Sequence, residues 1–326
     1  MSVLVTGGAG YIGSHTVRAL RRAGRDVVVI DTLEHGDASR LGDVPLVVGD
    51  VADRALVART CAAHGATSAV HFAAYKAVGE SMQQPIRYWR NNVGGSIRLM
   101  EGLRDAGVAT VVFSSSAAVY GTPARVPVAE DAPCRPESVY AETKHCVERI
   151  LVQLGAEGVR AVSLRYFNAA GASADASIGE DWSTSQNLVP RVMRALLEPG
   201  AALEVYGDDY PTPDGTCVRD YVHVDDLADA HVRALEYLER GGATLACNVG
   251  TGRGTSVREV LALAAAAAGR PVPHRVGPRR AGDPVEVWAD VALARTALGW
   301  TAARDLAEIV GSAWRWHSRG GTAARG

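Results

Sequence analysis

Lysine is almost absent from this chain. Lys76 and Lys144 are its only lysines among 34 basic residues, and all the others are arginines. Against that background, a lysine is expected where a compact ammonium on a flexible stem is needed and a guanidinium would not serve. Lys144 follows Tyr140 by four residues, and Lys76 follows a short apolar segment. Both lysines are therefore candidate site residues.

Other scarcities disfavour whole classes of protein. The five cysteines are scattered without C-x-x-C spacing, and the nine histidines contain no H-x-x-x-H pair. This pattern favours reduced thiols in a cytoplasmic protein and predicts no metal site. A net charge of −2 leaves no electrostatic footprint for nucleic acid. The longest apolar run, around 261–268, is too short to cross a bilayer, and no targeting segment is expected because 3–6 already has the pattern of a strand.

The first half of the chain alternates apolar, β-rich segments with helical patterns. Strands are predicted at 3–6, 27–30, 46–48, 69–72, 111–114 and 161–165, with helices at about 12–23, 54–64, 88–106 and 140–154. Nearly continuous apolar strands joined by helices indicate a parallel sheet that is covered on both faces. The predicted fold class is therefore α/β, with a doubly wound, Rossmann-type sheet.

The second half has a different pattern. After about residue 168, glycine and proline punctuate polar loops at 172–186 and 207–216 between short helices. The 326 residues are thus divided into a large domain, 1–168, and a smaller, interleaved C-terminal lobe, 169–326. Within that lobe, segments of about 220–250 are expected to return to the main sheet.

A glycine-rich turn lies between the first predicted strand and helix. Gly7, Gly10 and Gly13 permit a tight turn, close approach of the backbone to a pyrophosphate, and close packing of helix on strand. The helix N-terminus then directs free N–H groups at the phosphates. Asp31 lies 18 residues past Gly13, where it can accept both adenosine ribose hydroxyls, and no arginine follows it at once, so NAD is favoured over NADP. A tight turn without a ligand is the alternative.

A catalytic constellation is predicted from Ser116, Tyr140 and Lys144. A tyrosine with its ordinary pKa near 10 is a poor base at neutral pH. Lys144 lies one helical turn from Tyr140, and its ammonium, together with an oxidised nicotinamide, is expected to lower the pKa of the phenol. Ser116, at the end of the fifth strand, would hold the reacting oxygen. The alternative is an ordinary helix start with an exposed tyrosine and lysine.

With these residues the chain resembles the extended short-chain dehydrogenase/reductase family, and within it the UDP-glucose 4-epimerases (UDP-galactose 4-epimerases). The likeness covers nearly the whole length. It includes residues 6–16 (TGGAGYIGSHT), 71–81 (HFAAYKAVGES), 91–93 (NNV), 114–121 (SSSAAVYG), 140–144 (YAETK), 165–168 (RYFN), 206–224 (YGDDYPTPDGTCVRDYVHV) and 279–283 (RRAGD). The segment 206–224 is much more specific than the dinucleotide fingerprint.

The resemblance implies two sets of ligand contacts, one in each part of the chain. NAD would be contacted in the 1–168 domain, beside the three glycines, by Tyr11, Ile12, Asp31, Asp50, Val51, Phe72, Ala73, Ala74, Lys76, Asn91, Ser114, Ser116, Tyr140, Lys144 and Phe167. A UDP-sugar would be held mainly by the smaller lobe, through Asn168, Asn187, Leu188, Tyr206, Arg219, Arg280 and Asp283.

Some of these roles agree with the chemistry of the side chains. Arg219 and Arg280 carry forked donors that suit a pyrophosphate, Asp283 could accept ribose hydroxyls, and Tyr206 could pack on uracil. Plain salt-bridge or core roles remain the alternative for each. For Asp50, the sequence supports a role as a helix cap as well as it supports a contact to adenine.

The implied activity is interconversion of UDP-galactose and UDP-glucose. The sugar would be oxidised at C4 with NAD, would turn as a 4-keto sugar, and would be reduced on the opposite face. The resemblance also implies a homodimer built through the helices at 88–106 and 140–154, although core burial explains their apolar stripes equally well.

The chain departs from the common family pattern at two positions. Ala118 stands where many members carry a hydroxyl residue. Val287 stands where a bulky tyrosine closes the pocket beside the sugar 2-position. We therefore expect a pocket that also admits 2-acetamido sugars, so that UDP-GlcNAc and UDP-GalNAc are interconverted too.

Three other functions are alternatives to this one. A 4,6-dehydratase usually needs an Asp-Glu pair where this chain has Ala117 and Ala118, which disfavours elimination. A UDP-pentose or uronate 4-epimerase stays open, because the pocket near sugar C5 cannot be derived from sequence. A non-catalytic NAD-sensing regulator is disfavoured because it would need none of the Ser, Tyr and Lys set.

Overall fold

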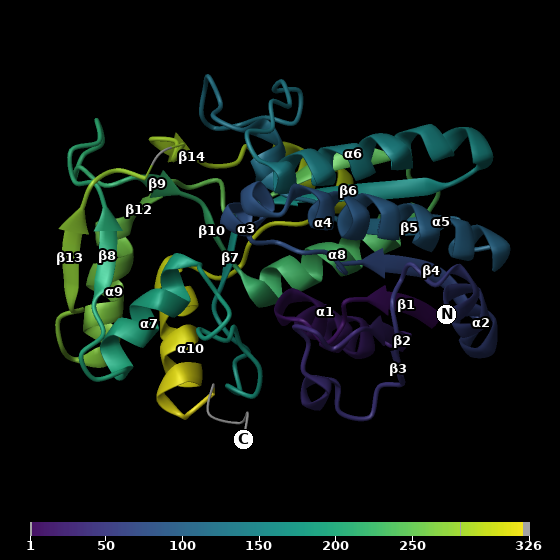
Figure 1. Cartoon of the computed structure of the whole chain (residues 1–326), viewed down its shortest axis with the longest axis horizontal. Helices are drawn as coiled ribbons and strands as arrows, with labels where there is room; N and C mark the ends of the chain where they lie inside the picture. Colours follow the sequence, from purple (N-terminus) through teal and green to yellow (C-terminus); the bar gives the residue numbers. More distant parts are fainter. Residues whose placement is uncertain (1, 281, 322–326) are drawn as a thin grey trace.

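A seven-stranded parallel sheet forms the centre of the computed structural model, which describes residues 2–280 and 282–321. The strand order is β11-β6-β5-β4-β1-β2-β3 (Figure 1), and every neighbouring pair is parallel. The predicted doubly wound sheet is confirmed. Its strands are β1 (Ser2–Thr6), β2 (Asp26–Asp31), β3 (Leu46–Val48), β4 (Ala66–His71), β5 (Thr110–Ser114), β6 (Arg160–Tyr166) and β11 (Leu245–Val249).

Helices cover both faces of this sheet. On one face α1 (Tyr11–Arg22) packs against α8 (Val224–Glu239), and on the other α2 (Arg54–His64) packs against α5 (Gly95–Asp105), with α6 (Val139–Gln153) beside them. Successive strand residues point to opposite faces. Val3 and Val5 of β1 therefore join the α1/α8 core, whereas Leu4 joins the α2/α5/α6 core. Because both faces are buried, the strands are apolar without alternation.

The predicted helix at 88–106 is not continuous. The chain forms α3 (Val78–Gln83), α4 (Pro85–Tyr88) and a π-helical stretch, η2 (Trp89–Gly94), before α5 begins. The wider turn directs Asn92 inward, where its amide pairs with the backbone N–H and C=O of Tyr75 at 2.9 and 3.0 Å and donates to Thr143 of α6 at 3.0 Å. Such π-helical turns interrupt helices at functional positions, and here the turn ties the loop after β4 to α6.

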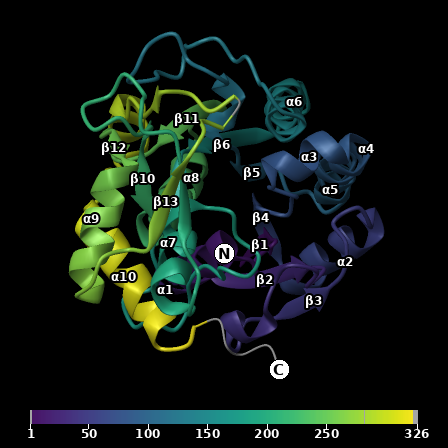
Figure 2. The same cartoon turned by 60° about the vertical axis from the view of Figure 1, so that its left-hand side comes forward.

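The smaller lobe gathers three helices around its own core, visible together in Figure 2: α7 (Leu188–Leu197), α9 (Val257–Ala268) and α10 (Leu306–Ser318). Its core includes Val192, Met193, Leu261 and Ile309. Its strands form small sheets, from β7 (Asn168–Ala170), β8 (Leu203–Tyr206), β9 (Val218–Arg219), β10 (Tyr221–His223), β12 (Thr255–Ser256), β13 (His274–Gly277) and β14 (Glu286–Val287). Single turns complete the chain: η1 (Ala38–Leu41), η3 (Ala117–Tyr120), η4 (Leu154–Glu157) and η5 (Ala294–Leu298).

The connectivity sets where a ligand can enter. β11 pairs with β6 at the edge of the main sheet, and α8 lies beside α1, so elements late in the chain complete the first half. The strand order reverses between β1 and β4, and in open α/β sheets the crevice outside the carboxyl ends at such a point binds the ligand. Among the described residues, no helix combines the length and apolarity needed to span a membrane, and no cluster of metal-ligating side chains is found.

Candidate active site

The glycine turn lies at this reversal point, after β1. Gly7 has φ +71°, and a Cβ there would come within 2.7 Å of the backbone nitrogen of Ala73. A Cβ on Gly13 would meet the carbonyl oxygen of Gly7 at 2.2 Å, and one on Gly10 would meet it at 3.3 Å. No side chain caps α1, whose N-cap is Gly10. Because the first N–H groups of a helix have no intrahelical partner, those of Tyr11 and Ile12 face the turn as an anion cradle.

Asp31 ends β2 beside this cradle. Its carboxylate is buried and accepts hydrogen bonds from the backbone N–H of Ala9 at 3.0 Å and of Leu33 at 2.8 Å. A carboxylate has about four acceptor positions, so two stay free for ribose hydroxyls. The cradle and the fixed carboxylate together fit an NAD molecule.

Tyr140, Lys144 and Ser116 come together at the carboxyl end of β5. Lys144 is buried and donates to the carbonyl oxygen of Ser114 at 2.8 Å. Tyr140 lies in the first turn of α6, where its backbone N–H donates to the hydroxyl of Ser81 at 3.1 Å, and its phenol has a hydrogen bond with Ser116. The three side chains predicted from spacing thus share one site.

The lowered pKa expected for Tyr140, with Lys144 and an oxidised nicotinamide acting together, is not reached by the protein without the nicotinamide. Burial and the nearby Tyr166 raise the pKa of the phenol well above its ordinary value, against the hydrogen bond with Ser116, which lowers it. Burial also lowers the pKa of Lys144 to about 7, despite the attraction of Glu148. Because the Lys144 ammonium lies 5.9 Å from the centre of the Tyr140 ring and donates to Ser114 instead, it does not outweigh the desolvation of the phenol.

The other predicted NAD residues differ in their solvent exposure. Phe72 packs on His231, with 4.7 Å between ring centres, and Val51 is buried in the core while Asp50 beside it is exposed. Lys76 is exposed and pairs with Glu180 at 3.2 Å. Ser114 shares a hydrogen bond with the Tyr166 hydroxyl, and the Asn91 amide donates a hydrogen bond to Asn92. The remaining residues of the set are partly buried: Ile12, Ala73, Ala74 and Phe167.

The predicted sugar-nucleotide residues form a charged group in the smaller lobe. Arg219 pairs with Asp283 at 3.4 Å, and the Arg280 guanidinium lies 4.6 Å from the centre of the Tyr206 ring. Hydrogen bonds from Arg280 and then Arg191 lower the pKa of Tyr206. Asn168 bonds the backbone of Asp220, and Asn187 and Leu188 stand at the start of α7. Excess guanidinium at this group suits a diphosphate.

Val287 lies between this group and the catalytic strand end. It pairs in register with Arg219 across β14 and β9. Its side chain is buried with Ala117 and Tyr120, and the partly buried Phe167 packs against the same cluster. Residue 287 therefore stands beside both predicted ligand sets.

The pattern of the NAD dependent epimerase/dehydratase family matches residues 3–250. The chain belongs to this family. A curated relative, the UDP-glucose 4-epimerase of Halalkalibacterium halodurans, is 44% identical over 97% of this chain and 96% of the relative.

Solved structures of this epimerase/dehydratase family agree in fold. The UDP-glucose-4-epimerase of Stenotrophomonas maltophila, with bound NAD and formylated UDP-arabinopyranose, is 43% identical with a TM-score of 0.96, over 99% of this chain and 100% of that one. The UDP-glucose 4-epimerase of Brucella ovis in complex with NAD is 45% identical with a TM-score of 0.94, over 96% and 97% of the two chains.

Three buried carboxylates near the candidate site were not predicted from the sequence, and Asp220 and Glu180 are the first two of them. Asp220 is fully buried and accepts from the backbone N–H groups of Thr251, Gly252 and Ala289, while its own N–H donates to the carbonyl oxygen of Val287. Its position inside the Arg219-Asp-Tyr motif could have drawn attention to it. Glu180 contacts two predicted site residues, Lys76 and Asn187, and no spacing pattern signals it.

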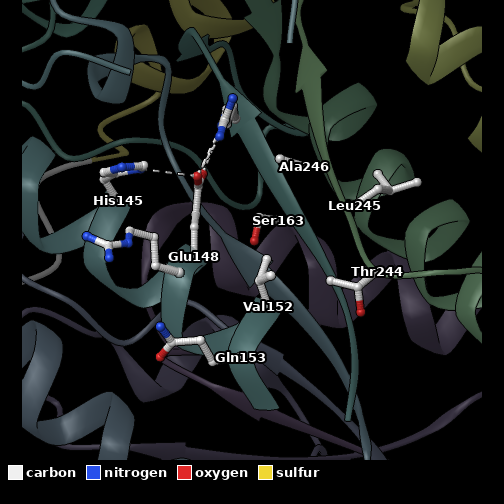
Figure 3. Close-up of a pocket in the computed structure, with 10 residues that line it drawn as sticks. His145, Glu148, Val152, Gln153, Ser163, Thr244, Leu245 and Ala246 are labelled. Atoms are coloured by element: carbon white, nitrogen blue, oxygen red, sulfur yellow. Dashed lines mark hydrogen bonds and ion pairs between the residues drawn. The ribbon is translucent and has the colours of Figure 1, made fainter. Parts of the chain in front are cut away.

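A third missed carboxylate, Glu148, belongs to a surface pocket between α6 and the β6/β11 edge (Figure 3). Glu148 lies near His145 there, at 3.8 Å, and forms a buried ion pair with Arg165 at 2.7 Å. It also accepts from Ser115, next to the catalytic strand end. None of the predicted site residues lines this pocket, so the candidate active site is defined by the cradle and the strand ends and not by this pocket.

Proposed function

We propose that this chain is an NAD-dependent UDP-sugar 4-epimerase that interconverts UDP-galactose and UDP-glucose. The observation that carries the proposal is the set of Ser116, Tyr140 and Lys144 at one strand end, with Tyr140 and Lys144 buried and Ser116 partly buried, next to a cradle that fits NAD. The arginines and the carboxylate of the smaller lobe support a nucleoside diphosphate as the anchor. Relatives of 43–45% identity are UDP-glucose 4-epimerases by name.

Each catalytic residue of the chain has a separate role in the proposed reaction. NAD, when bound, supplies the acceptor and later the donor of the hydride at sugar C4. Tyr140 takes the proton from the 4-hydroxyl and returns it after the sugar has turned. Ser116 holds the sugar oxygen through its hydroxyl, and Lys144 supplies positive charge within the same dry site. Because the pKa of Tyr140 is raised in the protein alone, its action as a base depends on positive charge gathered when the ligands are present.

Turning of the 4-keto sugar requires that the nucleotide is bound tightly and the sugar ring weakly. Arg219, Arg280 and Asp283 would hold the diphosphate and ribose, so the nucleotide stays in place. Val287 and Phe167 belong to one apolar cluster, and as a wall of the sugar pocket this cluster would oppose rotation little.

The same wall supports a wider substrate range. Val287 occupies much less volume than the tyrosine common at this position, and we propose that UDP-GlcNAc and UDP-GalNAc are interconverted too. A UDP-pentose is the second candidate substrate, because the Stenotrophomonas maltophila relative binds a formylated UDP-arabinopyranose.

The experiment is a stopped assay of purified protein without added NAD, in which the epimers are separated by chromatography. Conversion of both UDP-galactose and UDP-GalNAc supports the full proposal. Conversion of UDP-galactose alone removes the wider range. If neither is converted even with NAD supplied, the hexose 4-epimerase proposal fails, and UDP-arabinopyranose is then the substrate to try.

We also propose that the protein is a homodimer, that it is located in the cytoplasm, and that its two lobes bind different ligands. Exposed apolar side chains on α3 to α6 support a self-association surface: Met82, Ile86, Trp89, Ile97 and Val152. Five free cysteines fit a reducing compartment. In this proposal residues 1–168 hold NAD and residues 169–326 mainly hold the UDP-sugar, while elements at about 220–250 complete the main domain.

A further inference from the structure

Glu180 gathers groups from both sides of the candidate site onto one oxygen atom. Its Oε1 accepts hydrogen bonds from Lys76 Nζ at 3.2 Å, from Asn187 Nδ2 at 2.8 Å and from Ser185 Oγ at 2.8 Å. Lys76 follows β4 in the main domain, whereas Asn187 starts α7 in the smaller lobe. Ser185 also accepts from the backbone N–H of Asn187 at 3.1 Å. The two predicted ligand sets thus meet at this carboxylate.

The backbone around Glu180 is fixed from the opposite side. Its carbonyl oxygen accepts from the Trp316 indole of α10 at 3.3 Å. Gly179 lies so close to that indole that a Cβ there would come within 2.6 Å of it. Glu180 is also close enough to the cradle that, after burial, its charge is the next largest cause raising the pKa of Tyr11. The carboxylate therefore has a fixed place near the phosphate cradle.

The charge of Glu180 needs a partner. The residue is only 5% exposed, and its second oxygen, Oε2, has no hydrogen-bond partner among the described residues. A buried carboxylate without a cation is strongly disfavoured, and Lys76 is the cation that pairs with it. The Lys76 side chain is 60% exposed, so there is room for its ammonium to face a bound anion while it stays beside Glu180.

We infer that Glu180 is a positioning residue that couples the cofactor side of the site to the sugar-nucleotide side by holding Lys76 and Asn187 together. The inference rests on the proposed function, since it assigns Lys76 to NAD and Asn187 to the UDP-sugar. Loss of Lys76 leaves an unpaired anion next to Asn187, a predicted UDP-sugar contact, so it weakens an anionic ligand that Lys76 does not itself hold. A neutral glutamine at 180 still accepts from Asn187 and Ser185 but needs no cation.

The test is a cycle of UDP affinities measured by calorimetry on the NAD-containing protein, for wild type, Lys76→Met, Glu180→Gln and the double variant. Lys76→Met is expected to weaken UDP binding roughly tenfold, as for loss of a hydrogen bond to a charged group. In the Glu180→Gln background the same change is expected to alter UDP affinity less than about twofold. Retention of NAD through gel filtration should fall with Lys76→Met in both backgrounds, because that contact is direct.

Asp175→Asn is the matched control. It removes another carboxylate–cation pair of the same loop, that with Arg18 at 2.8 Å, and should leave UDP affinity unchanged. Equal effects of Lys76→Met in both backgrounds would overturn the inference. If Glu180→Gln does not fold, a cycle of Lys76→Met with Asn187→Ala replaces it, and additive losses there would overturn the inference as well. Failure of the proposed function itself is distinct: wild type would then bind no UDP and convert no UDP-sugar.

Discussion

At the scale of single residues, Tyr140 has the most demanding task. Its phenol is buried with a raised pKa, and it has hydrogen-bond contact with Ser116. Tyr140→Phe removes only the hydroxyl, so it should lower kcat at least ~100-fold, as for loss of a general base, while UDP affinity measured by calorimetry is kept. Tyr237→Phe, the same change in α8 outside the predicted ligand contacts, is the control. Full turnover by Tyr140→Phe would contradict the assigned chemistry.

Val287 sets the predicted range of sugars. Val287→Tyr should reduce the ratio of UDP-GalNAc to UDP-galactose turnover roughly tenfold or more, because a filled pocket rejects the acetamido group by sterics. The measurement compares kcat/KM for both substrates. Val276→Tyr on β13 controls for the added ring, since Val276 is exposed. An unchanged ratio in Val287→Tyr would show that residue 287 does not border the sugar 2-position.

Which residues could be predicted follows from how they are encoded. Tyr140 and Lys144 share one helix, so a spacing of four is enough to bring them together. Glu180 and Asp220 act through contacts to loops that are distant in sequence. No local sequence pattern predicts such a contact. The direction of the Tyr140 pKa was also beyond the sequence, because burial of the phenol depends on the whole fold.

At the scale of elements, the β1–α1 turn is the most exacting. A Cβ at position 13 would lie 2.2 Å from the Gly7 carbonyl oxygen and 2.9 Å from the Gly8 Cα, both backbone atoms that cannot move aside cheaply. Gly13→Ala should therefore yield protein without bound NAD, destabilised by about 1–3 kcal/mol. Absorbance of released nucleotide and urea unfolding measure the two effects.

The control for this turn is Gly79→Ala in α3. No atom lies within 4 Å of a Cβ placed there, and alanine favours helix over glycine. This variant should keep NAD and be no less stable than wild type. If Gly13→Ala retained NAD as well as Gly79→Ala does, the cradle would not be where NAD binds.

Helix boundaries were predicted well where caps set them, as in α2, which starts after the N-cap Asp53 and ends at Gly65 in the left-handed conformation, and less well at 88–106. There the sequence pattern is helical throughout, but the fold widens one turn so that Asn92 can bond Tyr75 and Thr143. Propensity scales do not distinguish a π-helical turn from an α-helical one. The interruption is decided by tertiary hydrogen bonds that the sequence does not display locally.

At the scale of the whole molecule, buried histidines predict acid sensitivity. Burial lowers the pKa of His71 to about 3 and those of His223, His231 and His317 to about 4. These folded values lie below the unfolded value near 6.5, so the unfolded state binds more protons as pH falls through this window. The stability is fully present above pH 6.5 and is lost towards pH 4.

Urea unfolding at pH 7.5, 6 and 5 tests this expectation. The free energy of unfolding should fall by several kcal/mol, because each buried neutral histidine contributes about 1.4 kcal/mol for every pH unit below about 6.5. His35→Gln should leave this profile unchanged, because its side chain is 65% exposed. A midpoint that does not move between pH 7.5 and 5 would contradict the assignment of these histidines as neutral.

The main sheet was predictable because its buried strands are continuous apolar runs separated by amphipathic helices. The smaller lobe was not resolved into elements, since strands of two to four residues such as β9, β12 and β14 carry no periodic signal. Their pairing depends on distant partners, as Val287 pairs with Arg219.

The proposed epimerisation requires that the hydride removed from sugar C4 returns to the same carbon. UDP-galactose carrying deuterium at C4 should be incubated with the purified protein in ordinary water, without added NAD, and the products analysed by mass spectrometry and NMR. The expected product is UDP-glucose that keeps its deuterium at C4. Conversion with loss of the label to solvent, or no conversion, would contradict it.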